Sequence, residues 1–138
     1  MIIIGDIGNT ETKICLVNSK KKIIKRISIN TNIITTKKLI KLLSSFDLKN
    51  KFIEKTLFCS VVPKTYKLFK LFFIHHYDLK TFELKELPIH SLLKVKVNFK
   101  QIGSDRLANS ISVMNNKDNF IILDFGTATT FDIVKKPG

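Results

Sequence analysis

Apolar residues in the first thirty positions of the chain fall into three short runs separated by turn-forming residues. The runs cover positions 1–7, 13–17 and 23–29 and are rich in isoleucine. Gly8-Asn9 separates the first two runs, and Asn18-Ser19-Lys20 separates the second from the third. Short runs of β-branched residues with such boundaries are typical of strands joined by tight turns. The pattern predicts an antiparallel meander of three strands.

Two later segments change to the spacing of a helix. Leucine and isoleucine recur every three to four positions over 36–46, and turn residues follow at 47–50. Over 64–77 the recurring residues are mostly aromatic, which indicates an amphipathic helix whose rings belong to the core. Between them, 57–62 is a continuous apolar run ending at Pro63, typical of a buried parallel strand followed by a helix start. The first helix is expected to cover one face of the sheet.

The last third of the chain has a less regular pattern. We expect extended segments at 79–87 and 92–99, and then a stretch over 103–115 in which a loop leads into a third helix. Ser104 is the expected N-cap of that helix, because a serine hydroxyl can accept a hydrogen bond from the backbone of the first turn. Two strands, 120–123 and 129–135, are expected on either side of a turn at 124–127. The region therefore predicts one helix followed by a hairpin.

Charge changes this picture little. The 138 residues have 44% apolar content, enough for one hydrophobic core, and a net charge of +13. Such a charge raises nucleic acid as a partner, because clustered cations release counterions from phosphates. Here nearly all the cations are lysines interleaved with apolar residues, and Arg26 and Arg106 are the only arginines. Solvated protein faces explain dispersed lysines better than a nucleic-acid surface does.

Cysteines, histidines and the first residues exclude several other classes. Cys15 and Cys59 each lie inside an apolar run, where cysteine acts as a small apolar residue, so a reducing cytoplasm is expected. His75, His76 and His90 lack metal-ligand spacing and are expected to be structural or exposed. No window reaches the roughly eighteen apolar residues of a membrane span, and the first residues do not form a signal peptide. We therefore expect a soluble protein without a membrane partner.

One pattern, apolar-apolar-x-Asp-x-Gly-polar, occurs twice at a constant offset. It covers 3–13, which contains Asp6, and 121–131, which contains Asp124. Glycine lets the backbone come close to a phosphate, threonine hydroxyls can donate to phosphate oxygens, and an aspartate can orient a cation. Two such hairpins could clamp a polyphosphate. The alternatives are that Asp-x-Gly is an ordinary hairpin turn and that Lys13, at the start of a strand, is simply solvated.

Three motifs together resemble those of type III pantothenate kinases. They are Asp-Ile-Gly-Asn-Thr-Glu-Thr-Lys at 6–13, Gly-Ser-Asp-Arg-Leu-Ala-Asn at 103–109 and Asp-Phe-Gly-Thr-Ala-Thr-Thr at 124–130. The resemblance implies the α/β fold of the actin, sugar-kinase and Hsp70 superfamily, in which two ribonuclease H-like domains hold ATP between them. It assigns 1–118 to a first, actin-like ATPase domain with a mixed sheet in the order βββαβα. It assigns 119–138 to the first hairpin of a second domain that is truncated.

The resemblance also implies roles in ATP and cation binding. The first phosphate-binding loop would consist of Asp6, Ile7, Gly8, Asn9, Thr10, Glu11, Thr12 and Lys13. Within it, Asp6 would lie near Mg²⁺, and Asn9, Thr10 and Lys13 would face phosphate oxygens. Thr127 would contact ATP from the second loop. Asp124 would bind the monovalent cation, K⁺ or NH₄⁺, that the family requires, since a carboxylate and carbonyl oxygens suit a hard cation.

For the middle motif, the resemblance implies contact with pantothenate. Asp105 would be the catalytic base that accepts the proton of the pantothenate hydroxyl, and Arg106 would grip the carboxylate through two parallel hydrogen bonds. Gly103 and Ser104 would supply backbone contacts. These parts suffice for phosphoryl transfer, which needs positioning and charge stabilisation. The alternative is that Asp105 only faces the positive end of a helix dipole and that Arg106 forms a surface ion pair.

The sequence departs from the family pattern in two ways. Lys96 stands where the family usually has a tyrosine, and Asn98-Phe99 stands where it usually has Asn-Pro, which alters the substrate contacts expected on that side. The family also continues well past the second phosphate loop. About half of the enzyme is therefore expected to be missing, which would leave sheet edges and an apolar sheet face uncovered.

The function implied by the resemblance is ATP-dependent phosphorylation of pantothenate to 4'-phosphopantothenate, the first step of coenzyme A synthesis, by a homodimer. One alternative is a catalytically silent module of the same fold that binds nucleotide or regulates another protein, because the second domain could not close over ATP. Another is an RNA- or DNA-binding protein, whose polynucleotide binding would depend steeply on salt. The spacing of arginine and aromatic residues does not favour the last alternative.

Overall fold

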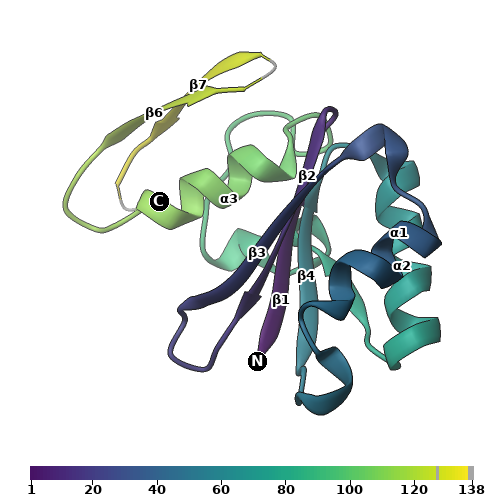
Figure 1. The fold of residues 1–138 in the computed structure, drawn as a ribbon. Coiled ribbons are helices and arrows are strands. Elements are labelled where there is room, and N and C mark those ends of the chain that lie inside the picture. Colours follow the sequence, from purple (N-terminus) through teal and green to yellow (C-terminus); the bar gives the residue numbers. More distant parts are fainter. Residues whose placement is uncertain (127, 137–138) are drawn as a thin grey trace. The chain divides into compact units, whose positions relative to one another are not determined.

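The computed structural model describes residues 1–126 and 128–136, which form two compact units (Figure 1). The first unit is Met1–Glu83 and the second is Leu84–Gly138. This division comes earlier in the chain than the expected domain boundary at residue 118. A compact unit need not coincide with a domain of the superfamily, so the assignment of 1–118 and 119–138 to separate domains stays a prediction.

The first unit is built on a five-stranded mixed sheet in the order β3-β2-β1-β4-β5. Its strands are β1 (Ile2–Ile7), β2 (Glu11–Val17), β3 (Ile23–Asn30), β4 (Lys55–Ser60) and β5 (Thr81–Glu83). The first three strands pair antiparallel, whereas β4 is parallel to β1 and β5 is parallel to β4. The meander, the buried parallel strand and the order βββαβα are confirmed, in an α/β fold consistent with the expected actin-like ATPase domain.

Two helices, α1 (Thr36–Ser44) and α2 (Pro63–Tyr77), cover one face of this sheet (Figure 1). The Thr35 hydroxyl caps α1 by accepting a hydrogen bond from the backbone N of Lys38 at 3.3 Å, and Pro63 is the first residue of α2, as expected. The helices and strands share one core, which includes the expected aromatic residues of α2. Its fully buried members include Ile3, Ile7, Ile14, Leu16, Leu39, Leu43, Phe46, Phe58, Phe69 and Phe73.

The described residues of the second unit contain the helix α3 (Ser104–Val113) and a hairpin of β6 (Phe120–Phe125) and β7 (Thr129–Val134). The expected helix and hairpin are therefore confirmed. Within residues 1–126 and 128–136, four short 3-10 helices connect the larger elements. They are η1 (Thr31–Ile33), η2 (Leu48–Asn50), η3 (Leu84–Glu86) and η4 (Ile89–Ser91).

The expected extended segments before α3 are only partly found. Within 79–87 the strand is limited to Thr81–Glu83, and 92–99 forms no strand. Asn98 bends the chain at the end of the second segment. Its carbonyl accepts hydrogen bonds from the backbone N of Gln101 and Ile102, and its side chain accepts one from the backbone N of Lys100. A polar residue that closes its own turn thus overrides the apolar-polar alternation before it.

The prediction that Ser104 caps α3 is wrong. Gly103 is the N-cap and has no side chain to accept a hydrogen bond, while Ser104 is the first helical residue and is 1% exposed. In the first turn, the Asp105 carboxylate accepts a hydrogen bond from the backbone N of Arg106 at 2.8 Å. Asp105 therefore satisfies one of the amides that an N-cap side chain would otherwise satisfy.

The two faces of the β6–β7 hairpin differ in burial. Phe120, Ile122, Asp124, Thr130, Asp132 and Val134 are buried or half-buried on the face that packs on α3. The opposite face, called the outer face below, carries Ile121, Leu123, Phe125, Phe131 and Ile133, which are 49–77% exposed. The expected uncovered apolar face is thus found on this hairpin.

Replacing Phe125 and Phe131 together by serine should roughly halve the self-associated fraction of the chain, because contiguous exposed apolar area drives association. Sedimentation velocity over a range of concentrations would measure that fraction. Phe52→Ser provides the matched control, since Phe52 is 83% exposed and lies in the first unit, outside the outer face. Equal self-association of the double variant and the unaltered chain would contradict the prediction.

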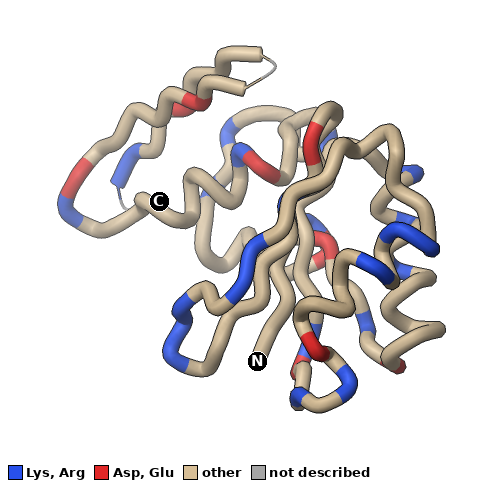
Figure 2. The backbone as a smooth tube through the Cα atoms, in the orientation of Figure 1, with Lys and Arg blue, Asp and Glu red and all other residues tan. Residues whose placement is uncertain are grey.

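Basic residues are spread over strands, helices and loops of both units (Figure 2). This distribution agrees with the expectation that the lysines lie on solvated faces. Among the helices that the structure describes, none combines the length and the apolar composition needed to cross a membrane.

Candidate functional site

The first Asp-x-Gly motif forms the turn between β1 and β2. The backbone N of Gly8 donates to the carbonyl of Glu11 at 3.0 Å, and the register places Asp6 opposite Lys13 and Ile7 opposite Thr12. Residues directly opposite each other in a sheet share a face, so Asp6 and Lys13 lie on one face and Ile7 and Thr12 on the other. The second pair is fully buried. Ile7 and Thr12 can therefore meet a nucleotide only through their backbone.

The polar side chains of this loop other than Thr12 are open to solvent. Asp6, Asn9 and Thr10 are exposed. Lys13 forms an ion pair with Glu11 at 3.4 Å, in which the two side chains are 43% and 47% exposed. Such an exposed pair contributes little free energy, so a phosphate oxygen can replace Glu11 as the partner of Lys13. The geometry fits the expected phosphate contact and also a solvated lysine, and the role of Lys13 stays a prediction.

The structure adds Thr31, which belongs to none of the three sequence motifs, to this loop. The Thr31 hydroxyl donates to the carbonyl of Gly8 at 2.7 Å, and its backbone N donates to the carbonyl of Thr10 at 2.9 Å. The Thr12 hydroxyl is 2.9 Å from that of Thr31 and must donate there, because the single Thr31 proton is used on Gly8. Thr31 is 5% exposed. It supports the turn from the side opposite Asp6 and Lys13.

Thr31→Val should lower the free energy of unfolding by about 1–3 kcal/mol, because it leaves the buried Thr12 hydroxyl and the half-buried Gly8 carbonyl without this partner. Urea denaturation followed by circular dichroism would measure the change. Thr31→Ser keeps the hydroxyl and should retain most of the stability. If valine and serine had equal effects, the hydrogen bonds would not be the cause.

The second Asp-x-Gly motif forms the tighter turn between β6 and β7. The backbone N of Gly126 donates to the carbonyl of Ala128 at 3.2 Å, and Asp124 lies opposite Thr130. The constant offset between the motifs would instead place Phe131 opposite Asp124, as Lys13 lies opposite Asp6. The strand-turn-strand form is confirmed in both copies, but the second turn is one residue shorter. Thr127, the expected ATP contact, lies outside the described residues.

Asp124, the expected ligand of the monovalent cation, is held by α3. Its Oδ2 accepts a hydrogen bond from Nδ2 of Asn109 at 3.1 Å. This contact fixes the orientation of the carboxylate, whose oxygens are of the kind that suits a hard cation. Residues 1–126 and 128–136 contain no cluster of three or more His, Cys, Asp or Glu suited to a metal. A cation at Asp124 would therefore need backbone carbonyls or ligand oxygens to complete its coordination.

The third motif begins α3 and carries the residues expected to meet the substrate. Asp105 lies in the first turn with Oδ1 bound to the backbone N of Arg106, and within the described residues Oδ2 has no hydrogen bond. The Arg106 side chain binds Asp132 on β7. Its Nε is 3.0 Å from both carboxylate oxygens, its Nη2 is 2.5 Å from Oδ1, and Nη2 also donates to the carbonyl of Phe131 at 3.2 Å.

The ion pair between Arg106 and Asp132 is more enclosed than the surface ion pair that was the alternative role for Arg106. The Arg106 and Asp132 side chains are 35% and 11% exposed. The pKa of Arg106 is raised above its ordinary value, chiefly by its hydrogen bonds to Asp132, while burial acts in the opposite direction. Arg106 does grip a carboxylate, as expected, but in this structure the carboxylate belongs to the chain itself. Its expected contact with pantothenate stays a prediction.

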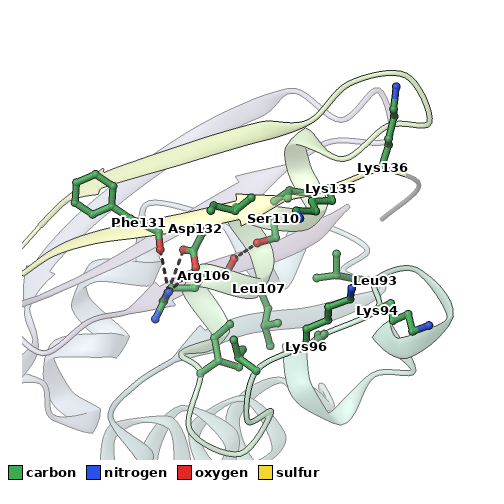
Figure 3. Close-up of a pocket in the computed structure, with 15 residues that line it drawn as sticks. Leu93, Lys94, Lys96, Arg106, Leu107, Ser110, Phe131, Asp132, Lys135 and Lys136 are labelled. Atoms are coloured by element: carbon green, nitrogen blue, oxygen red, sulfur yellow. Dashed lines mark hydrogen bonds and ion pairs between the residues drawn. The ribbon is translucent and has the colours of Figure 1, made fainter.

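Arg106 and Asp132 line a pocket of about 680 Å³ among α3, β7 and the segment 93–97 (Figure 3). Four lysines contribute to its lining: Lys94, Lys96, Lys135 and Lys136. The rest is mostly apolar, with Leu93, Leu107 and Phe131 among the residues. A cationic and apolar pocket of this size fits a small organic anion with an aliphatic part. Lys96, the departure from the family pattern, is part of this lining.

Comparison with known proteins identifies the family. The model of the family described as type III pantothenate kinase matches residues 2–138. The chain belongs to the type III pantothenate kinase family. All three motifs and the pocket residues named above lie within the match.

Several curated type III pantothenate kinases are similar to this chain. That of Pelagibacter ubique (strain HTCC1062) is 64% identical over 136 residues, which cover 99% of this chain and 55% of that protein. That of Kosmotoga olearia is 33% identical, over 98% of this chain and 54% of that protein. That of Endomicrobium trichonymphae is 30% identical, over 100% of this chain and 58% of that protein. The chain thus spans about half the length of the curated relatives it matches.

Proposed function

We propose that this chain is the part of an ATP-dependent pantothenate kinase that binds pantothenate and the phosphates of ATP. The product would be 4'-phosphopantothenate, formed in the first step of coenzyme A synthesis. The observation that carries the proposal is the start of α3 in a member of this family, where Asp105 is next to Arg106 and Arg106 lines a basic pocket. Pantothenate is an aliphatic carboxylate with hydroxyl groups, which suits that pocket.

Asp105 would act as the base that accepts the proton of the reacting hydroxyl. Its Oδ1 is held by the backbone N of Arg106, so Oδ2 is the oxygen available for the proton. Arg106 would contact the substrate carboxylate, and the lysines of the pocket would attract the anion. Gly103 and Ser104 would contribute backbone groups only, which agrees with the burial of the Ser104 side chain.

The first hairpin would receive phosphate oxygens at Asn9, Thr10 and Lys13, and Thr127 would contact ATP from the second. ATP would supply the phosphoryl group, while Mg²⁺ near Asp6 and K⁺ or NH₄⁺ at Asp124 would neutralise charge on the phosphates. The chain's own contribution is to orient the ligands: Thr31 supports the first turn, and Asn109 fixes Asp124. These residues position groups for an in-line transfer and do not react themselves.

The proposal includes a cytoplasmic homodimer. Both cysteines, Cys15 and Cys59, are free thiols, which agrees with a reducing compartment. The second candidate function is a catalytically silent module that binds nucleotide or regulates another protein. One observation is compatible with it: the outer face of the hairpin is exposed and could meet another protein.

Transfer of labelled γ-phosphate from ATP to pantothenate would test the proposal. The chain would be assayed with K⁺ and with Na⁺, alone and fused to the carboxyl-terminal part of the Pelagibacter ubique relative that lies beyond the matched residues. The kinase proposal predicts transfer by the fusion, with K⁺ more effective than Na⁺. Binding of ATP without transfer by either form would favour the silent module, and no binding of ATP or pantothenate would overturn both.

A further inference from the structure

The Arg106 guanidinium uses only part of its hydrogen-bonding capacity within the chain. Asp132 accepts from Nε and Nη2, and the Phe131 carbonyl accepts a further bond from Nη2 (Figure 3). Nη1 has no hydrogen bond to any residue in 1–126 or 128–136. A guanidinium has five N–H groups in a rigid plane, so fixing one edge also fixes the direction of the remaining two.

Asp132 is well placed to fix that edge. It is 11% exposed and lies on the face of β7 that packs on α3, so its carboxylate is largely enclosed. It is also the only acid among the residues that line the pocket. An acid in a pocket for an anion repels that anion, so a carboxylate at this position is expected to contribute to binding in another way.

We propose that Asp132 is a positioning residue that holds Arg106 by the Nε–Nη2 edge and leaves Nη1 to bind the substrate carboxylate. The inference rests on the proposed function and alters one part of it. Nη2 is already used by Asp132 and Phe131, so the substrate carboxylate meets Arg106 through Nη1 rather than through two parallel bonds. Asp132 therefore orients the Arg106 guanidinium but weakens the electrostatic attraction of the pocket for the substrate carboxylate. The pocket lysines supply the remaining attraction.

The sign of the effect separates this role from a simple charge effect. Asp132→Asn removes the only acid from the pocket lining, so charge alone would make the pocket bind an anion more tightly. The positioning role gives the opposite result, because Arg106 loses the partner that sets its orientation. We expect pantothenate binding to weaken about tenfold or more, as for loss of a charged hydrogen-bond partner.

Two readouts test the proposal on the whole chain. Isothermal titration with pantothenate gives the affinity of the unaltered chain, Asp132→Asn, Asp132→Glu and Lys135→Gln. We expect Asp132→Glu to restore part of the affinity, since it keeps the carboxylate, and Lys135→Gln to weaken binding modestly without affecting Arg106. Unchanged or tighter binding by Asp132→Asn would overturn the proposal.

The second readout needs no substrate. The chain has two arginines, Arg26 and Arg106, so ¹⁵N-labelled arginine gives two Nε–H signals, and Arg26, in the first unit, serves as the internal reference. Hydrogen exchange at Nε of Arg106 should be slow in the unaltered chain and at least about tenfold faster in Asp132→Asn. Equal exchange would overturn the proposal. Slow exchange together with no pantothenate binding by the unaltered chain would show that the ion pair exists and that the proposed substrate is wrong.

Discussion

Asp105→Asn is expected to slow phosphoryl transfer to pantothenate by about 10²–10⁴-fold, the usual contribution of a general base. The substitution keeps the shape of the side chain, and the amide oxygen can still accept the hydrogen bond from the backbone N of Arg106. It removes the carboxylate that would take the proton of the reacting hydroxyl. The rate should be measured at saturating ATP and pantothenate, in whichever form of the protein transfers phosphate.

A matched control separates this loss from a general effect of losing one negative charge. Asp118 also lies in the second unit, and its carboxylate accepts a hydrogen bond from Asn115 at 3.3 Å on the exposed surface. Asp118→Asn should leave the rate within about twofold, as expected for a surface substitution. If Asp105→Asn kept more than about a third of the activity, Asp105 would not be the base, and its role would be limited to the first turn of α3.

The strands and helices of the first unit could be predicted because each follows one local rule. The isoleucine-rich runs and the turn at Gly8-Asn9 define the meander, and Pro63 marks the start of α2 at the residue where it begins. The errors arose where a second local interaction competes with the pattern. Asn98 closes its own turn at the end of an alternating segment, and Asp105 satisfies an amide that a capping Ser104 would have satisfied.

The candidate site shows a different limit. The sequence identifies residues by motif, so it located Asp6, Asp105 and Asp124, but it could not identify partners that come from distant elements. Thr31 reaches Gly8, and Asp132 reaches Arg106, only through the pairing of strands and helices within each unit. No local spacing distinguishes these two residues from other threonines and aspartates. The register of the second hairpin could not be predicted from the motif either. A turn that is shorter by one residue changes the residue opposite Asp124 without changing the motif.

The second large effect is expected in the core of the first unit, at Phe58. This residue is fully buried, and its ring centroid is 5.0 Å from that of Phe69 and 6.0 Å from that of Phe73. It joins strand β4, which pairs with β1 and β5, to helix α2. Phe58→Ala should lower the free energy of unfolding by about 3–5 kcal/mol, which is a large part of the stability of a typical domain. Guanidinium unfolding followed by circular dichroism would measure the loss.

Gly5 makes this prediction more specific, because it lies opposite Phe58 in the β1–β4 pairing. A Cβ on Gly5 would overlap the Phe58 ring and would lie 3.0 Å from the Lys13 carbonyl. Gly5→Ala alone should therefore destabilise the chain by about 1–3 kcal/mol through overpacking. In the Phe58→Ala background the same methyl group enters the space left by the ring, so its cost should fall to what the close contact with the Lys13 carbonyl leaves. Additive effects of the two substitutions would show that the ring does not rest on Gly5. A coupling energy of about 1 kcal/mol or more would show that the Phe58 ring on β4 packs directly against the backbone of Gly5 on β1.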